Sequence, residues 1–430
     1  MSPFKAYDIR GVYPDEIDEQ FAYNIGKTLG KKHEPIAVGI DSRIGSEKIR
    51  DYFIQGIIDE ISDVCYLGLV STPLLYFATK NRFSLGIMIT ASHNPRDYTG
   101  FKICDKNAIP LLPIEDIQCN FKKQSLPNEI RKIEDTGKDI IEEYSNLFIR
   151  KLAQFKNYNI SADFSNGSTV VERKILEQVF PKINVINGIP DGNFPSHPPN
   201  ALGQESTQQL RNLVKETQSD IGIIFDGDGD RIGIIDEKGN EVRGDILTAI
   251  IAREMLKSNK GKILYDLRSS SVVPEIISEY GGLPIKTRVG HPFIKKLMRK
   301  EDAIFAGEFS NHFYFKEIGG FESPLLALYY ILSALNGRNL SEEVKDLTKY
   351  CHSGEINIDT DNPTESINKL IDEFITKKIE KIDGVTISEN NWWVNIRPSN
   401  TEPLIRITAE AEDEKTLTEL IETVKGVLLS

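Results

Sequence analysis

Short apolar runs alternate with longer amphipathic stretches over the first four-fifths of the chain. Buried strands are predicted by five runs of mostly apolar residues, each followed by a polar loop: 36–40, 85–89, 221–225, 262–265 and 303–306. Helical spacing follows the first of these runs, over residues 46–61. Strand, helix and strand in this order predict α/β layers with largely parallel sheets, in which ligands bind beyond the carboxyl ends of the strands.

The last part of the chain has a different pattern. Residues 385–388 and 392–396 have strand character, residues 404–410 alternate, and residues 413–429 have the spacing of an amphipathic helix. This order predicts a small α+β unit. The longest apolar run, residues 325–335, is shorter than the roughly 20 residues that a membrane helix needs, so we interpret it as a buried helix.

Four domains are predicted from these patterns, over residues 1–138, 139–243, 244–352 and 353–430. A chain of 430 residues is too long for one ordinary core, at roughly 100–200 residues per domain. The clearest linker is the polar stretch 121–138. Blocks of strand, loop and helix recur weakly in the first three domains, which indicates a repeated unit.

Composition narrows the class of protein. Hydrophobic residues make up 40% of the chain and charged residues 27%, which is the usual globular balance. The net charge of −12 argues against a nucleic-acid partner, but not against an anionic substrate, because local clusters of Arg and Lys capture such ligands. The four cysteines form no Cys-x-x-Cys pair, so neither a zinc site nor a disulfide framework is predicted. Since the N-terminus has no apolar leader, we expect a cytoplasmic protein.

Three aspartates follow the predicted strand 221–225. Asp226, Asp228 and Asp230 are separated by glycines, and alternate residues of an extended segment point the same way, so their carboxylates are predicted to converge. Hard oxygen ligands at this density suit Mg²⁺ or Ca²⁺. An EF-hand loop is excluded, because its sixth position requires glycine and is Arg231 here. A solvated acidic turn is the plain alternative, and it leaves the mutual repulsion of three carboxylates unexplained.

A second polar segment, Thr90-Ala-Ser-His-Asn-Pro95, follows the predicted strand 85–89. A serine at the end of a strand is expected to be exposed and suits a nucleophile, here Ser92. The absence of a Gly-x-Ser-x-Gly elbow disfavours acyl chemistry. The nearby Lys102 suits a phosphoryl group as a point charge. The structural alternative is a Ser/Asn turn that Pro95 stops.

Two more loops carry dense polar groups. The segment Gly307-Glu-Phe-Ser-Asn-His312 is expected to be extended, so that Glu308, Ser310 and His312 share one side and suit the hydroxyls of a vicinal sugar diol. The segment Arg397-Pro-Ser-Asn-Thr-Glu402 offers a guanidinium, two hydroxyls, an amide and backbone N–H groups, which suit a dianionic phosphate. A polar surface turn and a hairpin turn are the structural alternatives.

Two short segments add single candidates. Tyr7-Asp-Ile-Arg-Gly11 places Arg10 at the start of the first domain, and Arg288-Val-Gly-His291 offers an imidazole just before a predicted helix. A lone histidine is more often structural than catalytic. Together these segments would supply a hydroxyl nucleophile, a metal site, a sugar site and a phosphate site, and no structural alternative predicts all four.

With these segments in this order, the chain resembles the α-D-phosphohexomutases, close to the phosphomannomutase/phosphoglucomutase branch. The resemblance runs from residue 4 to residue 403. Its four signatures are residues 90–95, 226–231, 307–312 and 397–401, and residues 193–200 are also similar to a family segment. The resemblance implies three similar α/β/α domains with mixed sheets, plus a smaller C-terminal α+β domain, around a central cleft.

The same resemblance implies a role for each matching residue. Ser92 would carry the transferred phosphoryl group, and Asp226, Asp228 and Asp230 would hold one Mg²⁺ per chain together with a phosphoserine oxygen. Either Lys102 or His291 would act as the acid and base. Arg10, Lys102 and Arg231 would surround the transferring group. The contacts to the sugar and to its second phosphate would come from Tyr7, Arg268, Glu308, Ser310, His312, Arg397, Ser399, Asn400 and Thr401.

The implied function is interconversion of hexose 1-phosphate and hexose 6-phosphate, of mannose or glucose, through a hexose 1,6-bisphosphate. Phosphoglucosamine mutase is an alternative, because no residue visibly distinguishes the substituent at C2. A metal-dependent sugar-phosphate phosphatase and a sugar-phosphate sensor are further alternatives. Asn311 stands where this branch usually has glycine, which bears on the preferred hexose, and Arg268 replaces an expected lysine. The expected partner is a small phosphosugar, with neither nucleic acid nor membrane, and a homo-oligomer stays open.

Overall fold

The computed structural model describes residues 2–5, 7–31, 35–60, 63–113, 117, 125–127, 129–360, 362–374, 376–398 and 404–429. The chain divides into two compact units. Unit 1 holds Met1–Val242 and Ser310–Ser341, and unit 2 holds Arg243–Phe309 and Glu342–Ser430. No described helix is long and apolar enough to cross a membrane.

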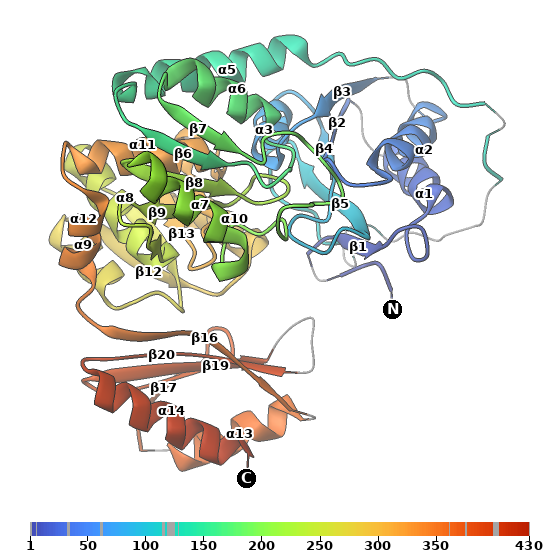
Figure 1. Cartoon of the computed structure of the whole chain (residues 1–430). Helices are drawn as coiled ribbons and strands as arrows, with labels where there is room; N and C mark the ends of the chain where they lie inside the picture. Colours follow the sequence, from blue (N-terminus) through green and yellow to red (C-terminus); the bar gives the residue numbers. More distant parts are fainter. Residues whose placement is uncertain are drawn as a thin grey trace. The chain divides into compact units, whose positions relative to one another are not determined.

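The first sheet, in unit 1, has the strand order β1-β5-β4-β2-β3. Strands β2, β3 and β4 are mutually parallel, whereas β5 runs antiparallel to both β4 and β1. Helices α1 and α2 pack against each other on one side of this sheet, and α3 lies on the other (Figure 1). The elements are β1 (Ile9–Val12), α1 (Glu19–Gly30), β2 (Ile36–Ile40), α2 (Ser46–Ile58), β3 (Val64–Leu69), α3 (Thr72–Thr79), β4 (Leu85–Ile89) and β5 (Tyr98–Asp105).

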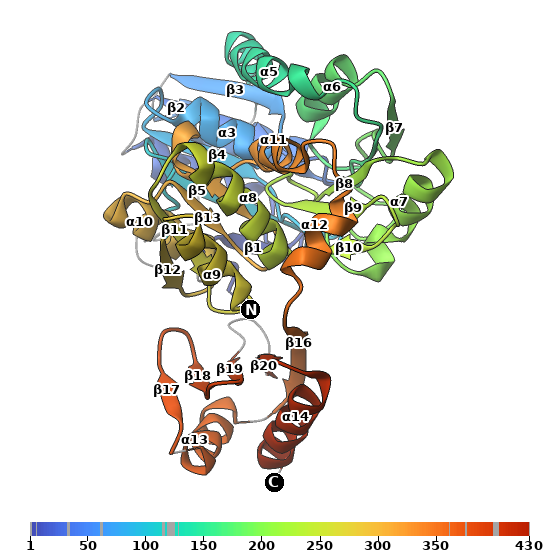
Figure 2. The ribbon, with the colours of Figure 1, turned by 90° about the vertical axis from the view of Figure 1, so that its left-hand side faces the viewer.

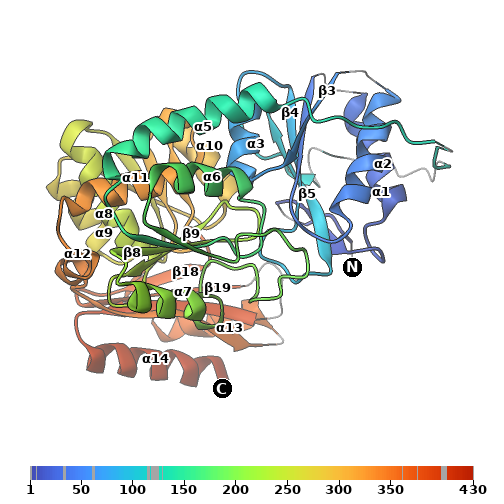
Figure 3. The ribbon, with the colours of Figure 1, turned by 45° about the horizontal axis from the view of Figure 1, so that its top comes forward.

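The second sheet, also in unit 1, repeats this topology with the order β10-β9-β8-β6-β7. Strands β6, β7 and β8 are parallel, and β9 runs antiparallel to β8 and β10. Helices α6 and α7 lie on opposite sides of it (Figure 3). The elements are α5 (Lys138–Leu152), η1 (Ala153–Phe155), β6 (Ile160–Asp163), α6 (Val170–Val179), β7 (Ile183–Ile186), α7 (Gln204–Thr217), β8 (Ile221–Phe225), β9 (Ile232–Asp236) and β10 (Glu241–Val242).

The third sheet has the order β12-β11-β13-β14-β15. Its unit 2 strands β11, β12 and β13 are parallel, and its unit 1 strands β14 and β15 are antiparallel. The elements are α8 (Gly244–Ser258), β11 (Lys262–Asp266), α9 (Val272–Glu279), β12 (Leu283–Thr287), α10 (His291–Glu301), β13 (Phe305–Gly307), β14 (Phe313–Phe315), η2 (Lys316–Ile318), β15 (Phe321–Glu322), α11 (Pro324–Leu335) and α12 (Leu340–Leu347).

The fourth sheet, in unit 2, is antiparallel with the order β16-β20-β19-β18-β17. Helices α13 and α14 lie together on one face (Figure 2), and their apolar sides close a core around Ile387, Ile396 and Ile407. The elements are β16 (Cys351–Asp359), α13 (Pro363–Glu373), β17 (Lys378–Glu380), β18 (Val385–Ser388), β19 (Trp392–Pro398), β20 (Leu404–Ala411) and α14 (Glu414–Leu429).

These sheets confirm the predicted fold class, including the mixed sheets that the resemblance implies, whereas the alternation of strand and helix by itself predicted largely parallel sheets. The strands that helices connect are parallel, as the alternation predicts, but in each of the first two sheets two of the four strand pairings are antiparallel. The antiparallel pairs β4–β5 and β8–β9 are each joined by a polar loop with no helix between the strands, which alternation of strand and helix does not reveal. The predicted helix over 46–61 begins at Ser46 and ends at Ile58.

The topology places three of the predicted polar loops at equivalent positions. Each one joins two strands that are neighbours in their sheet: residues 90–97 join β4 and β5, residues 226–231 join β8 and β9, and residues 308–312 join β13 and β14. The fourth predicted segment begins in β19, and its residues 399–402 lie outside the described residues. The first three polar segments therefore belong to one recurrent connection of the fold.

Candidate active site

The serine loop begins where β4 ends. Ser92 has a backbone φ of 51°, in the left-handed region that a non-glycine residue adopts only when its surroundings hold it there. Its N–H donates to the Thr90 hydroxyl at 2.8 Å. The prediction of an exposed serine is wrong, because Ser92 is only 1% exposed. Its Oγ lies 3.1 Å from a carboxylate oxygen of Asp226 and 3.3 Å from Nδ1 of His93.

Arg43, just beyond β2, holds the backbone of this loop. Its guanidinium donates to the carbonyls of Ser92 at 2.6 Å and Asn94 at 2.5 Å, and also to those of Pro95 and Tyr98. Its side chain is fully buried, and its Nε lies 3.2 Å from Asp41. The sequence analysis did not identify Arg43. The sequence does contain a signal for it: Asp41 and Arg43 directly follow the predicted strand 36–40, at the edge of the sheet where ligands bind.

The three aspartates converge as predicted, but through a turn instead of an extended segment. The carboxylates of Asp226, Asp228 and Asp230 each offer a ligand atom within 4.8 Å of the others. Gly229 has a φ of 69°, which glycine adopts at no steric cost. A Cβ on Gly227 would lie 2.7 Å from the carbonyl oxygen of Ser92, so only glycine lets this loop approach the serine loop so closely.

One lysine lies among these buried carboxylates. The ammonium of Lys102, on β5, donates to Asp228 at 2.5 Å and to Asp230 at 2.6 Å. Burial raises the pKa of Asp226 to about 8, with the charges of Asp230 and Asp228 adding to the effect. Burial also opposes ionisation of Asp230, but Lys102 and His312 outweigh it and hold the pKa of Asp230 well below its ordinary value.

The donor set fits a hard divalent cation. All three aspartates are buried, and Oδ1 of Asp228 has no hydrogen-bond partner among the described residues. The other oxygen of Asp228 accepts from the Thr72 hydroxyl at 2.5 Å, and its carbonyl accepts from the Thr72 N–H at 2.8 Å. Thr72, at the start of α3, therefore orients this carboxylate, much as outer partners orient metal ligands in proteins. Thr72 was also absent from the sequence prediction.

Further cationic and imidazole groups lie beside the aspartates. The Arg231 N–H donates to Asp226 at 3.2 Å, and its guanidinium Nε lies 3.2 Å from Nε2 of His312. That imidazole nitrogen lies 3.3 Å from Asp230, and Nδ1 of His312 lies 3.1 Å from the Ser310 hydroxyl. Ser310 and His312, predicted as sugar contacts, are thus part of the same cluster as the predicted metal ligands.

Arg10, on β1, lies against the serine loop. Its guanidinium pairs with Asp8 and donates to the side chain of Asn94 at 2.5 Å. Tyr7 precedes β1 by two residues. His93 is kept neutral, because Arg231, burial and Arg10 together hold its pKa well below the ordinary value. Arg10 therefore contacts the serine loop through Asn94.

The loop between β13 and β14 is a turn, which corrects the prediction of an extended segment. Asn311 has a φ of 65°, and asparagine tolerates this left-handed conformation better than most residues. Its side chain is fully buried and donates to the carbonyl of Ile232 on β9 at 3.1 Å. Asparagine can therefore adopt the left-handed backbone conformation at this position, as glycine can, and its side chain hydrogen-bonds to β9.

Two predicted residues of unit 2 lie close to one backbone turn. Glu308 is buried and accepts from the N–H of Gly290, directly before His291 at the start of α10. Arg268 is buried and pairs with Asp266 at 2.6 Å, and Asp266 also accepts from the N–H of Phe309. The guanidinium of Arg268 therefore lies close to the start of the loop that carries Glu308.

Arg397 is the last but one residue of β19 in unit 2, and its guanidinium donates to Glu355 at 2.5 Å. Ser399, Asn400 and Thr401, predicted beside it, lie outside the described residues. Unit 1 thus brings together Ser92, Lys102, Arg10, Arg231, the three aspartates, Ser310 and His312, while Glu308, His291, Arg268 and Arg397 belong to unit 2. Within unit 1 the arrangement can hold a phosphorylated hydroxyl against a cation and neutralise its charge.

Comparisons with known proteins cover nearly the whole chain. Four domains of the phosphoglucomutase/phosphomannomutase family match it in order: alpha/beta/alpha domain I over residues 1–127, domain II over 140–239, domain III over 243–350 and the C-terminal domain over 355–427. A phosphomannomutase of Methanocaldococcus jannaschii is 53% identical over 437 residues, which cover 99% of this chain and 97% of that protein.

Two further relatives extend this similarity. A phosphomannomutase of Escherichia coli strain K12 is 34% identical over 446 residues, covering 97% of each chain. The crystal structure of a phosphoglucomutase/phosphomannomutase family protein from Burkholderia thailandensis superposes with a TM-score of 0.84 at 26% identity, and covers 99% of this chain and 96% of that one.

Proposed function

The chain belongs to the phosphoglucomutase/phosphomannomutase family and is a phosphohexomutase, and from this premise we propose that it interconverts hexose 1-phosphate and hexose 6-phosphate of mannose, glucose or both. We propose further that Ser92 carries the phosphoryl group between turnovers, and that a hexose 1,6-bisphosphate is the intermediate. The family gives the class of enzyme, and these proposals add the residue that carries the phosphoryl group and the path of the reaction.

One observation carries the proposal. A serine hydroxyl, in a left-handed turn that Arg43 holds from behind, lies 3.1 Å from the first of three converging carboxylates. The Ser92 hydroxyl donates to Asp226, but a phosphoryl group on that hydroxyl would add negative charge to the acid cluster and would need cations to neutralise it. Lys102 and Arg231 lie at that point, which supports phosphoryl transfer.

The reaction then proceeds by two phosphoryl transfers. The phosphoryl group on Ser92 passes to the free hydroxyl of a hexose monophosphate, the oxygen–phosphorus bond to Ser92 breaks, and the hydroxyl proton passes by way of an acid/base group to the Ser92 oxygen. The bisphosphate turns end over end, and the Ser92 oxygen then bonds to the phosphorus of the other phosphoryl group. The bond between that phosphorus and the sugar oxygen breaks, and the Ser92 proton passes by way of the acid/base group to the sugar oxygen. Lys102, Arg10 and Arg231 neutralise the charge of the transferring group, and Lys102 or His291 moves the proton.

We propose Mg²⁺ as the metal, held by Asp226, Asp228 and Asp230. Three carboxylate oxygens without a sulfur or imidazole ligand are the donors that this cation prefers. When bound, the ion supplies positive charge next to the phosphoryl oxygens. Thr72 keeps Asp228 in a ligating orientation through its hydroxyl and N–H.

We propose that the remaining predicted residues bind the sugar and its second phosphate. We propose that Glu308, Ser310 and His312 bind hydroxyls of the sugar, and that Tyr7 and Arg268 also contact the substrate. We propose that Arg397, Ser399, Asn400 and Thr401 hold the phosphate that is not reacting. A mutase needs such a second phosphate site, since either end of the bisphosphate must be able to occupy it, and a phosphatase does not.

Replacing the nucleophile tests this function. We expect Ser92→Ala to lower conversion of mannose 1-phosphate and glucose 1-phosphate by at least about a thousandfold, because the variant lacks the hydroxyl that accepts the phosphoryl group. Intact-mass measurement should find one phosphoryl group on part of the wild-type protein and none on the variant. Ser84→Ala is the matched control, since Ser84 lies just before β4 and Ser92 just after it.

Other results would redirect the assignment. Near-normal turnover by Ser92→Ala would end the phosphoserine proposal. Faster release of inorganic phosphate than of isomerised sugar would favour a phosphatase, and a preference for glucosamine phosphates in the same panel would replace the proposed hexose.

A further inference from the structure

Three arginines of unit 2 converge on one glutamate. Arg397 donates to Oε2 of Glu355 at 2.5 Å, and a guanidinium nitrogen of Arg268 lies 3.4 Å from the same oxygen. Arg406 reaches the other oxygen, Oε1, at 3.3 Å. The side chains of Arg268 and Arg397 are only 6% and 7% exposed, while that of Glu355 is 23% exposed. The glutamate therefore has access to water that two of its partners lack.

Strand register explains why an anion belongs at this point. Arg397 on β19 and Arg406 on β20 are directly opposite each other, an arrangement of like charges that costs free energy. Asn357 on β16 is opposite Arg406, so Glu355, two residues earlier, lies on the same face as a diagonal neighbour. The three guanidinium groups need a counter-ion there, and Glu355 contacts all three of them.

Glu355 remains ionised in this setting. Burial works to raise its pKa, but Arg268, Arg397 and Arg406 outweigh burial, so the pKa of Glu355 lies below its ordinary value. A carboxylate and a phosphate compete for the same donors, because both accept paired hydrogen bonds from a guanidinium. The cluster also contains Asp266, paired with Arg268, so three positive and two negative groups leave a net charge of about one for a phosphate.

We propose that Glu355 competes with the substrate phosphate for the three arginines. Between turnovers it is their counter-ion and holds them together, and during turnover it lowers their affinity for phosphate. The inference rests on the proposed function, in which Arg397 binds the phosphate that is not reacting. A mutase must release that phosphate so that the bisphosphate can turn, and an arginine cluster with no counter-ion would hold it too tightly.

Titration of inorganic phosphate into the full-length protein, followed by calorimetry, tests the inference without any turnover. We expect Glu355→Gln to bind phosphate about tenfold more tightly than the wild type, because one negative charge near the ligand is lost while the side chain keeps its shape. Glu355→Asp, with a shorter carboxylate, should fall between the two. In the double variant with Arg397→Gln the gain should vanish, which assigns the binding to this cluster.

Glu301→Gln is the matched control, since Glu301 pairs with Lys262 at 2.9 Å and is exposed to a similar degree, at the far end of α10. It should leave phosphate binding unchanged. With glucose 1-phosphate as substrate, Glu355→Gln should lower KM and lower kcat together, since release becomes slower. A purely structural role would not tighten binding.

Unchanged or weaker phosphate binding in a folded Glu355→Gln, with Glu355→Asp behaving like the wild type, would overturn the inference. That result is distinct from failure of the proposed function. If the wild type does not interconvert hexose phosphates but Glu355→Gln binds phosphate more tightly, the function fails while the competitor role stands; if interconversion proceeds and binding does not tighten, only the inference fails.

Discussion

Single charged side chains, buried and shared between loops, determine the geometry of the candidate site. Arg43 reaches three carbonyls of the serine loop and the carbonyl of Tyr98 on β5, and Lys102 bridges two aspartates. A buried charge of this kind stabilises only when its partners satisfy it completely, and removing one partner is costly. The loops that carry Ser92 and Asp228 are therefore fixed by side chains that come from other strands.

Arg43→Lys tests this at the serine loop. A lysine offers its donors from one point, and so it cannot reach four carbonyls and Asp41 together. We expect kcat to fall at least about tenfold with little change in KM, and the free energy of unfolding to fall by about 1–3 kcal/mol. Arg50→Lys is the control, because Arg50 lies on α2 and pairs with Asp51 and Tyr66 instead of the loop. An Arg43→Lys enzyme with normal kcat would contradict the positioning role.

Asp228→Asn tests the metal site. The substitution removes charge while keeping size, and we expect Mg²⁺ affinity, measured by calorimetry on the protein without substrate, to weaken at least about tenfold. Most of the mutase activity should be lost as well. Asp220→Asn is the control, since Asp220 lies before β8 and Asp228 beyond its other end. Full activity of the wild type in excess chelator would argue against any metal.

At the scale of elements, the site depends on two polar loops that touch through glycine. Thr72, at the start of α3, links the same region to Asp228, and a Cβ on Gly167 would lie 2.7 Å from the carbonyl of Gly227. The loops after β4 and β8 are thus packed against each other and against the start of α3. A larger side chain at the contact between these loops would therefore displace the loops and the strand ends that carry them.

Gly227→Ala tests this contact. Its Cβ would come 2.7 Å from the Ser92 carbonyl and 3.1 Å from Pro199, so the loops must separate. We expect activity to fall at least about tenfold and the free energy of unfolding to fall by about 1–3 kcal/mol, the usual cost of overpacking. Gly426→Ala, in α14 with open space around it, should instead stabilise the protein by about 0.5–1 kcal/mol. Denaturant unfolding and steady-state kinetics measure both effects.

At the scale of the whole molecule, the two units have separate spectroscopic signals. Both tryptophans, Trp392 and Trp393, lie on β19 in unit 2, so tryptophan fluorescence follows that unit, whereas far-UV circular dichroism follows both. Multi-domain chains often unfold in more than one transition.

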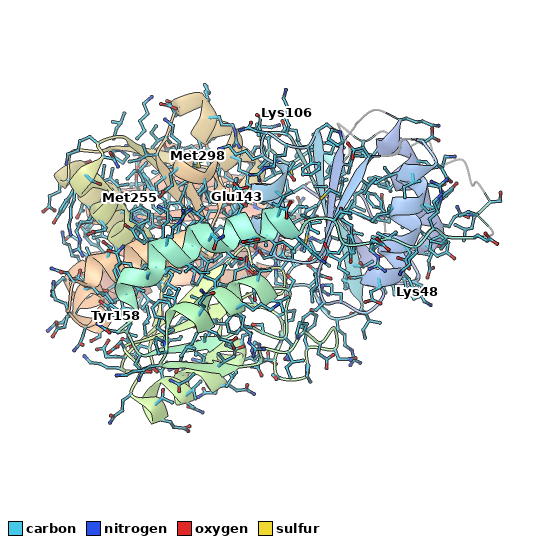
Figure 4. The ribbon with its side chains drawn as sticks, turned by 90° about the horizontal axis from the view of Figure 1, so that it is seen from above. Lys48, Lys106, Glu143, Tyr158, Met255 and Met298 are labelled. Carbon is cyan, nitrogen blue, oxygen red and sulfur yellow. The ribbon has the colours of Figure 1, made fainter. Side chains whose placement is uncertain are left out.

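The surface of unit 1 carries ordinary ion pairs, such as that of Arg82 with Glu143. Glu143 lies on α5 (Figure 4). Exposed pairs of this kind contribute little to the stability of the unit.

Protonation of His197 should make the stability of unit 1 depend on pH. Burial lowers its pKa, but the hydrogen bond and charge of Asp163 outweigh burial, with a contribution from Glu205, so the pKa of folded His197 is raised. Because the folded pKa exceeds the unfolded one, this stabilisation is complete below about pH 6.5 and is lost as the pH rises through the folded value.

His197→Gln removes this stabilisation. We expect the variant to lose about 1–3 kcal/mol at about pH 5.5 and clearly less at about pH 8.5, measured by circular dichroism. Asn184→Gln, at another hydrogen-bonded position of the second sheet, should show no such difference between the two pH values. An equal loss at both would mean that the pair with Asp163 does not titrate.

The amino-acid sequence alone determined the fold class, the strands 36–40, 85–89, 221–225 and 385–388, and the loops that hold the chemistry. These are local properties, since apolar periodicity and turn residues decide where strands begin and end. The ranges of β2, β4, β8 and β18 match those predictions. The convergence of Asp226, Asp228 and Asp230 is local in the same sense, since five residues span it.

Only the tertiary structure decided which residues support these loops. Arg43 and Thr72 are far in sequence from Ser92 and Asp228, and Glu355 is far from Arg397 and Arg406, so no local pattern joins them. Strand order and register bring these partners together, and burial then makes each charged contact strong enough to matter. The turn at Asn311 and the burial of Ser92 follow from the same cause, because long-range packing imposes backbone conformations that the local sequence only tolerates.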